Sequence, residues 1–411
     1  MRAAPFKGGY MQTAQGHLTY CTNIHPGENW EGHFAALQKN FPSIKAQVSP
    51  DAEMGIGLRL SHEASLELQN VDKLTEFKQW LDTNNAYVFT MNGFPYGEFH
   101  NVEVKDQVHA PDWTTQERLD YTLRMFNILA QLLPTGMEGG ISTSPLSYRY
   151  WHATPDLFKE ATIGGTANIL NVATELIRID QQQGIYMHLD IEPEPDGILE
   201  TGPEYINWYT DVLLPQGRPL IAETFGVSQH EAERLIKRHI CLCYDVCHFA
   251  IGYEPHAQII KELEEKGLKT GKIQISAALK ADLPESAKSR KPILDAFERF
   301  NEPTYLHQVI AKTNNGELLR YRDLPGALAD GVNTEVNEWR AHFHVPIFTE
   351  DFGLLKATQT DIEEVLKINK KTPFSTHLEV ETYTWSVLPD EKKLPMDDSI
   401  ARELNWVRDI L

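Results

Sequence analysis

The sequence has few cysteines, no long apolar run and no excess of positive charge, and each absence excludes a class of protein. Four cysteines in 411 residues are too few for a disulfide scaffold. Three of them share the apolar run 240–252 and are not spaced as paired metal knuckles, so we expect buried free thiols. No apolar run reaches the roughly 18 residues of a membrane span, and residues 1–20 lack the apolar core of a signal peptide. We therefore expect a cytoplasmic protein without a membrane span.

The charge balance is acidic, with a net charge of −20 and no block of like charge. Phosphate backbones are bound by clustered lysine and arginine, which this chain does not offer. A nucleic-acid partner is therefore not expected, and the acidity is read as a solvated surface.

Short apolar runs alternate with amphipathic helical stretches along the whole chain, and no linker or repeat interrupts them. Alternation of this kind predicts a parallel sheet, and eight units fit a closed (β/α)8 TIM barrel better than an open sheet. We expect one domain over residues 1–411. The predicted strands are 17–24, 54–60, 86–99, 140–151, 184–192, 240–252, 272–279 and 376–385. The predicted helices between them include 29–41, 71–85, 114–133, 228–239 and 256–265. Asp112 or Thr114 is the expected cap of the helix 114–133.

One stretch departs from this alternation. Residues 305–328 contain two alternating runs around Asn314-Asn315-Gly316, which is a hairpin signal. We expect a hairpin insertion at about 303–348, in which 339–348 returns the chain to the barrel mouth. The helix 358–369 and the last strand would follow.

Carboxylates stand at the ends of two predicted strands. Side chains alternate along a strand, so His188, Asp190 and Glu192 share one face, and Glu192 reaches the carboxyl rim where barrel chemistry occurs. The alternative is that Glu192 and Glu194 only solvate a loop, and Glu194 is the weaker candidate. In the last strand His377, Glu379, Glu381 and Tyr383 share a face, and Glu381 lies nearest the strand end.

The strand between them ends in Asp245, with His248 three residues later. A carboxylate in an apolar strand is expected to be paired or bound to a metal. Asp245 could also simply cap the next turn while His248 packs against the loop. On the neighbouring strand, Gln274 can offer an amide oxygen towards the same centre.

This donor set predicts a site for a divalent metal ion, Mn²⁺, Mg²⁺ or Zn²⁺, formed by Glu192, Asp245, Gln274 and Glu381. Such a centre polarises the oxygens of a polyol-like metabolite while Glu192 or Glu381 moves the proton beside a carbonyl. That chemistry is aldose–ketose isomerisation or epimerisation. Candidate substrate-binding residues at the mouth are His25, Asn92 and His344, with His342 on the same face as His344.

The motifs LDIEPEPDG, CYDVCHFA and LEVETYTW resemble the xylose-isomerase-like, or sugar phosphate isomerase/epimerase, barrels from about residue 184 onward. Together with LTYCTNIHPGENW, YRDLP and HFHVPIF they resemble one branch, the EboE-type metabolite traffic proteins, over most of the chain. The resemblance implies Glu192, Asp245, the residue at 274 and Glu381 as metal ligands, with His248 beside the substrate as a catalytic residue. The superfamily usually has histidine where this chain has Gln274.

Two other function classes stay open from the sequence. A non-enzymatic metabolite-binding protein is favoured by Gln274, whereas a metal-dependent phosphodiesterase is disfavoured by the net charge of −20. The sequence does not specify the substrate, the metal or the oligomeric state.

Overall fold

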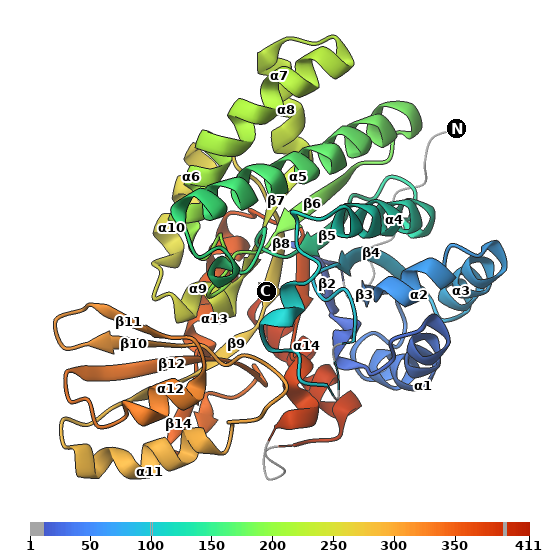
Figure 1. Cartoon of the computed structure of the whole chain (residues 1–411). Coiled ribbons are helices and arrows are strands. Elements are labelled where there is room, and N and C mark those ends of the chain that lie inside the picture. The colour runs from blue at the N-terminus through green and yellow to red at the C-terminus, as the bar shows by residue number, and fades with distance from the viewer. Residues whose placement is uncertain (1–11, 99, 101, 389–392) are drawn as a thin grey trace.

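The computed structural model describes residues 12–98, 100, 102–388 and 393–411 (Figure 1). Eight parallel strands follow one another in the order β2-β15-β8-β7-β6-β5-β4-β3, and a parallel bridge between Cys21 and Gly57 joins the β2 side to β3. The predicted (β/α)8 barrel is therefore confirmed. The strands are β2 (Gly16–Tyr20), β3 (Met54–Arg59), β4 (Ala86–Asn92), β5 (Gly139–Thr143), β6 (Met187–Ile191), β7 (Ile240–Asp245), β8 (Thr270–Ile275) and β15 (His377–Val380), with the short β1 (Gln12–Thr13) antiparallel on β2.

Helices surround the sheet, as the amphipathic stretches predict (Figure 1). Most begin at a side-chain cap: Thr115, rather than the expected Asp112 or Thr114, accepts from the Arg118 N–H at the start of α4. The helices are α1 (Trp30–Val48), α2 (His62–Glu67), α3 (Val71–Thr83), α4 (Gln116–Leu132), α5 (Pro155–Gln183), α6 (Gly202–Trp208), α7 (Leu214–Phe225), α8 (Gln229–His239), α9 (Val246–Ile251), α10 (His256–Glu265), α13 (Gln359–Lys371) and α14 (Met396–Ile410).

Alternation along the strands separates an apolar outer face from a polar lumen. On β6, Met187, Leu189 and Ile191 belong to the hydrophobic core, while His188 and Asp190 form a hydrogen bond with each other and lie against Gly140 of β5 and Gly271 of β8. The barrel interior is thus lined by titratable side chains that are fully buried.

A six-stranded antiparallel sheet lies beside the barrel, in the order β11-β10-β12-β9-β14-β13 (Figure 1). Its strands are β9 (Ala277–Asp282), β10 (Val309–Thr313), β11 (Leu318–Tyr321), β12 (Val336–Val345), β13 (Asp351–Phe352) and β14 (Leu355–Ala357), accompanied by α11 (Ala287–Glu298) and α12 (Leu324–Ala329). The hairpin around residues 314–316 is β10 and β11.

This sheet extends beyond the bounds expected for the insertion, 303–348. The predicted strand 272–279 is divided at Ser276, because β8 stays in the barrel whereas β9 leaves it to pair with β12 and β14. Residues 339–345 lie within β12, so they reach the barrel mouth as part of a ten-residue strand.

All four cysteines are buried free thiols, as predicted. Among the helices of the described residues, none combines the length and the apolar character needed to cross a membrane.

Candidate metal centre at the carboxyl end of the barrel

A pocket of about 600 Å³, including its open mouth, lies at the carboxyl ends of the barrel strands. Carboxylates and imidazoles dominate its polar lining, and aromatic side chains form much of the rest. Its lining residues are Asn23, Asn92, Phe94, Pro95, Lys105, Val108, His109, Glu192, Glu194, His248, Tyr305, Leu306, Gln308, His342, His344, Glu381 and Tyr383.

Glu192 and Glu381 lie in this pocket, one residue beyond the ends of β6 and β15. Glu381 Oε1 accepts hydrogen bonds from Asn23 Nδ2 at 2.7 Å and from Asn92 Nδ2 at 3.1 Å. Burial, followed by the charge of Asp245, raises the pKa of Glu381 to about 8. Burial and the neighbouring Asp245 and Glu381 also raise the pKa of Glu192 well above its ordinary range. The charge of Lys272 lowers both pKa values only in part, and within the described residues no lysine or arginine forms an ion pair with either acid.

Asp245 combines the two roles that the sequence left as alternatives. Its Oδ1 caps α9 by accepting from the His248 N–H at 3.2 Å, and it also accepts from Ser276 Oγ at 2.6 Å. Its Oδ2 is buried and has no hydrogen-bond partner in the described part of the chain. The capping bonds fix the carboxylate, and the second oxygen remains available for a ligand.

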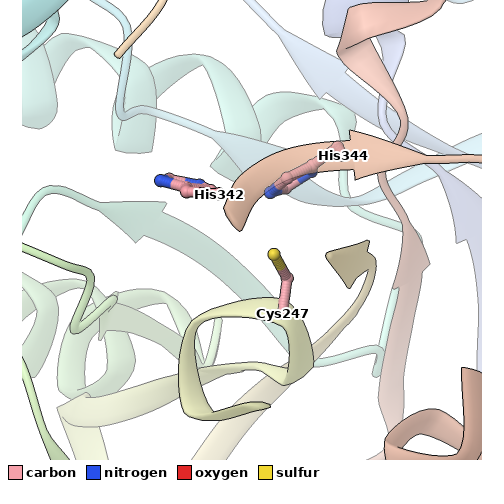
Figure 2. Close-up of side chains that lie close together, drawn as sticks. All are labelled: Cys247, His342 and His344. Atoms are coloured by element: carbon pink, nitrogen blue, oxygen red, sulfur yellow. The ribbon is translucent and has the colours of Figure 1, made fainter. Parts of the chain in front are cut away.

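The insertion sheet contributes imidazoles to this centre. Figure 2 shows His342 and His344 on β12, opposite the thiol of Cys247 from α9, and the ligating atoms of the three lie within 4.8 Å of one another. His344 Nδ1 lies 3.6 Å from Glu381 Oε2, and neither ring nitrogen of His344 makes a hydrogen bond to a described residue. Asp245, His248 and His344 form a second set within 4.8 Å.

The hydrogen bonds of His248 and His342 determine their tautomers. His248 Nδ1 lies 2.9 Å from the Pro193 carbonyl, and His342 Nδ1 lies 2.8 Å from Gln308 Oε1. Since both oxygens only accept, both Nδ1 atoms carry the proton, and the Nε2 atoms face each other at 3.2 Å. Two lone pairs at this separation repel unless a proton or a metal ion lies between them. Burial and the neighbouring His248 lower the pKa of His342 well below its ordinary value, which disfavours protonation of the His342 ring.

The structure brings together Glu192, Asp245, His248, Asn92, His344 and Glu381, whereas Gln274 and His25 are not among the residues that line the pocket. Gln274 is fully buried beside Asp245 in the strand register, and its Oε1 lies 4.0 Å from Cys243 Sγ. His25 also lies outside the lining, with Nε2 at 3.0 Å from the Tyr20 hydroxyl. The contact of His25 with substrate stays a prediction.

Some lining residues were underestimated or missed. Glu194 does not solvate a loop: it is 7% exposed, and its Oε1 lies 2.8 Å from His109 Nε2. Asn23 holds Glu381, and Gln308 orients His342. Single polar residues in loops carry no periodic signal, so only the spacing of Glu194 from Glu192 hinted at a shared role.

The donor set fits a divalent metal ion. Three buried carboxylates, an Asp245 oxygen without a hydrogen-bond partner and a His344 ring without one converge, and none of the lysines and arginines that the structure describes is bonded to them. Buried charges of one sign are stable only when they are protonated, paired or bound to a metal. Carboxylate and imidazole together suit Mn²⁺ or Zn²⁺, and the oxygen-rich side of the set also suits Mg²⁺.

The chain is similar in structure to several solved proteins at low sequence identity. No protein-family model and no curated protein matches the sequence. Among solved structures, the IOLI protein with a bound zinc atom is 13% identical, covers 96% of this chain and 97% of its own, and has a TM-score of 0.45. A xylose isomerase-like TIM barrel protein from Mycobacterium smegmatis in complex with magnesium is 10% identical, with coverages of 98% and 93% and a TM-score of 0.48. A xylose isomerase domain protein from Alicyclobacillus acidocaldarius is 10% identical, with coverages of 95% and 96% and a TM-score of 0.40. Because these TM-scores are below 0.5, the barrel fold rests on the strand order of this chain and not on the similarity.

Proposed function

We propose that this chain is a metal-dependent isomerase or epimerase that acts on a sugar-like or polyol metabolite, in keeping with its resemblance to the xylose-isomerase-like barrels and their EboE-type branch. The single observation that carries the proposal is the buried convergence of Glu192, Asp245 and Glu381, with an unpartnered oxygen on Asp245. A bound divalent ion supplies positive charge that polarises the hydroxyl and carbonyl oxygens of the substrate.

The chain's own residues divide the remaining work. Glu192 and Glu381 lie in the pocket from non-adjacent strands, so either can take a proton from the carbon beside a carbonyl and return it to the neighbouring carbon or to the other face. His248 lines the pocket with its Nδ1 held by the Pro193 carbonyl, so its Nε2, which faces His342 Nε2, is the atom that can contact a substrate hydroxyl or the ion. Asn92 holds Glu381, and the aromatic wall around Phe94 and Tyr305 limits access of water.

Proton transfer tests the proposal without knowledge of the substrate. Protein loaded with Mn²⁺ or Zn²⁺ is incubated in D₂O with a panel of aldoses, ketoses and polyol-derived ketones, and deuterium beside the carbonyl is followed by NMR. We expect incorporation with at least one compound and its loss in Glu381→Gln. The proposal fails if the purified protein holds no divalent ion, if added ions do not raise its thermal stability, and if no compound exchanges.

The second candidate is a metabolite-binding protein that does not catalyse. It is favoured by Gln274, which stands at a predicted ligand position but does not line the pocket. Gln274→His separates the two candidates: tighter metal binding with new exchange activity indicates a lapsed catalyst, whereas unchanged ligand binding without exchange indicates a carrier.

A further inference from the structure

A second cluster of ligating side chains lies at the amino end of the barrel. Glu138 directly precedes β5, His188 is the second residue of β6, and His377 is the first residue of β15. Their ligating atoms lie within 4.8 Å of one another. His188 precedes Glu192 by four residues, which corresponds to about 13 Å along an extended strand. The cluster is therefore separate from the pocket at the carboxyl end.

His377 is the member of this cluster whose contacts are least complete. Its side chain is fully buried, and neither ring nitrogen makes a hydrogen bond to any described residue. Its ring centroid lies 5.1 Å from that of His188, and its Nε2 lies 3.9 Å from Glu138 Oε1. Leaving a buried polar atom without a hydrogen bond is unfavourable, so a ring with two such atoms points to a missing partner between these three side chains.

His188 is oriented by a carboxylate. Its Nδ1 lies 2.6 Å from Asp190 Oδ1, so Nδ1 donates and the lone pair of Nε2 is free to bind a ligand. A carboxylate behind a histidine in this way is typical of metal sites. A side chain at Gly140 or Gly271 would overlap this pair, so the two glycines provide the space that it occupies.

An open pocket of about 520 Å³, including the solvent at its mouth, gives access to the cluster. Glu138, His188, Tyr186 and Cys241 line it together with residues 373–376. The Glu138 side chain is 37% exposed, so it can rotate towards the two imidazoles, and it accepts a hydrogen bond from Thr376 Oγ1. Cys241 belongs to an overlapping set with His188 and Asp190, but Asp190 Oδ1 is already engaged by His188.

We propose that Glu138, His188 and His377 bind a divalent transition-metal ion at the amino end of the barrel, with Zn²⁺ as the best match, and that Asp190 positions His188. Two imidazoles and one carboxylate, with a fourth position open to that pocket, form a common zinc environment. Tetrahedral zinc with bonds of about 2.0 Å requires ligands about 3.3 Å apart, so from their present separations within 4.8 Å the Glu138 side chain must rotate and the two imidazole rings must turn towards each other. The ion would connect the starts of β5, β6 and β15 across the barrel.

Zinc titration of the full-length protein tests this site. The protein is freed of metal with a chelator and titrated with Zn²⁺ by calorimetry, and bound zinc is counted after gel filtration. Glu138→Gln keeps the size of the side chain and lies at a partly exposed position, so the fold is expected to persist. Glu53→Gln is the matched control, because Glu53 directly precedes β3 as Glu138 precedes β5.

We expect Glu138→Gln to lose one equivalent of zinc, through affinity weakened about 100-fold, whereas Glu53→Gln binds as the wild type does. The same comparison in an Asp245→Asn background separates the zinc bound at the two ends. The Asp245→Asn protein should bind one equivalent of zinc, and the double variant with Glu138→Gln should lose it. If the wild type binds only the one equivalent of zinc that Glu138→Gln removes, the carboxyl end binds no metal. The proposed function is then contradicted, whereas the amino-end site is supported. If Glu138→Gln leaves the stoichiometry and affinity unchanged in both backgrounds, the amino-end site is overturned.

Discussion

The two ends of the barrel are formed by the same faces of the same strands but present different side chains. On β6 the face begins with His188 and leads to Glu192, and on β15 it begins with His377 and leads to Glu381. The carboxyl end therefore collects carboxylates, to which the insertion adds imidazoles, whereas the amino end collects imidazoles together with the partly exposed Glu138 and with Asp190, which is bonded to His188. One lumen can thus hold two different polar centres, provided that the charge between them is balanced.

Lys272 provides that balance. Its Nζ lies 2.7 Å from Glu379 Oε1 and 2.8 Å from Ser142 Oγ, and all three side chains are fully buried. Although burial lowers it, the charge of Glu379 raises the pKa of Lys272 above its ordinary value. The lysine separates the acidic end from the histidine end.

The largest expected effect follows from removing this lysine. Lys272→Met leaves the Glu379 carboxylate buried without a partner, which should lower the free energy of unfolding by about 3–5 kcal/mol. Urea denaturation measures the loss. Because the double variant Lys272→Met, Glu379→Gln removes both charges, it should recover most of the stability. A loss below about 1 kcal/mol in the single variant would show that the charge of Lys272 is not needed to balance Glu379.

The pH dependence of the free energy of unfolding reports on another buried acid, Glu403, which is bonded to Thr382, the residue after Glu381. Glu403 on α14 accepts hydrogen bonds from Thr382 Oγ1 at 2.8 Å and the Ile347 N–H at 3.2 Å, and burial raises its pKa from 4.5 to about 7. The folded state therefore binds this proton more tightly, so its contribution to stability is present below pH 4.5 and is lost as the pH rises through 7.

Glu403→Gln stays neutral and keeps an acceptor oxygen. Its free energy of unfolding should equal that of the wild type near pH 4 and exceed it by up to about 3 kcal/mol at pH 8. Denaturation at a series of pH values checks this, with Glu53→Gln as the control for a glutamate replaced at the other end. A difference that is constant with pH would contradict a raised pKa at Glu403.

A smaller effect concerns the residue that orients His188. Asp190→Asn weakens the hold on the Nδ1 proton, so zinc affinity at the amino end should fall about 10–100-fold while the carboxyl end binds metal as before. Calorimetric titration in the Asp245→Asn background isolates the relevant site. Equal losses at both ends would indicate a general disturbance of the lumen.

The smallest expected effect is the counterpart at the carboxyl end. Ser276 Oγ donates to Asp245 Oδ1 and accepts from the Cys247 N–H at 3.2 Å. Ser276→Ala should lower metal affinity at the carboxyl end about tenfold, since the helix cap still holds Asp245, and should leave the amino-end zinc unchanged. Titration with Mn²⁺, which binds imidazole-rich sites less tightly than Zn²⁺ does, follows the carboxyl end selectively.

Much of the fold could be predicted because its signals are local. The apolar run and the alternation along residues 184–192 specify a strand, and the carboxylate that ends it specifies where a site would lie. The hairpin around residues 314–316 was readable from its turn. The strand 272–279 was less so, because nothing local distinguishes the part that stays in the barrel from the part that leaves it at Ser276.

The sequence by itself therefore determined which side chains share a strand face and which stand at its carboxyl end, because period-two alternation needs no distant contact. Only the tertiary structure decided which faces meet. Barrel closure brings His377 to His188 across 189 positions of sequence, and the antiparallel sheet carries His344 to Glu381. The same closure leaves Gln274 and His25 outside the pocket, because contacts between distant segments depend on strand order and packing, which no local pattern records.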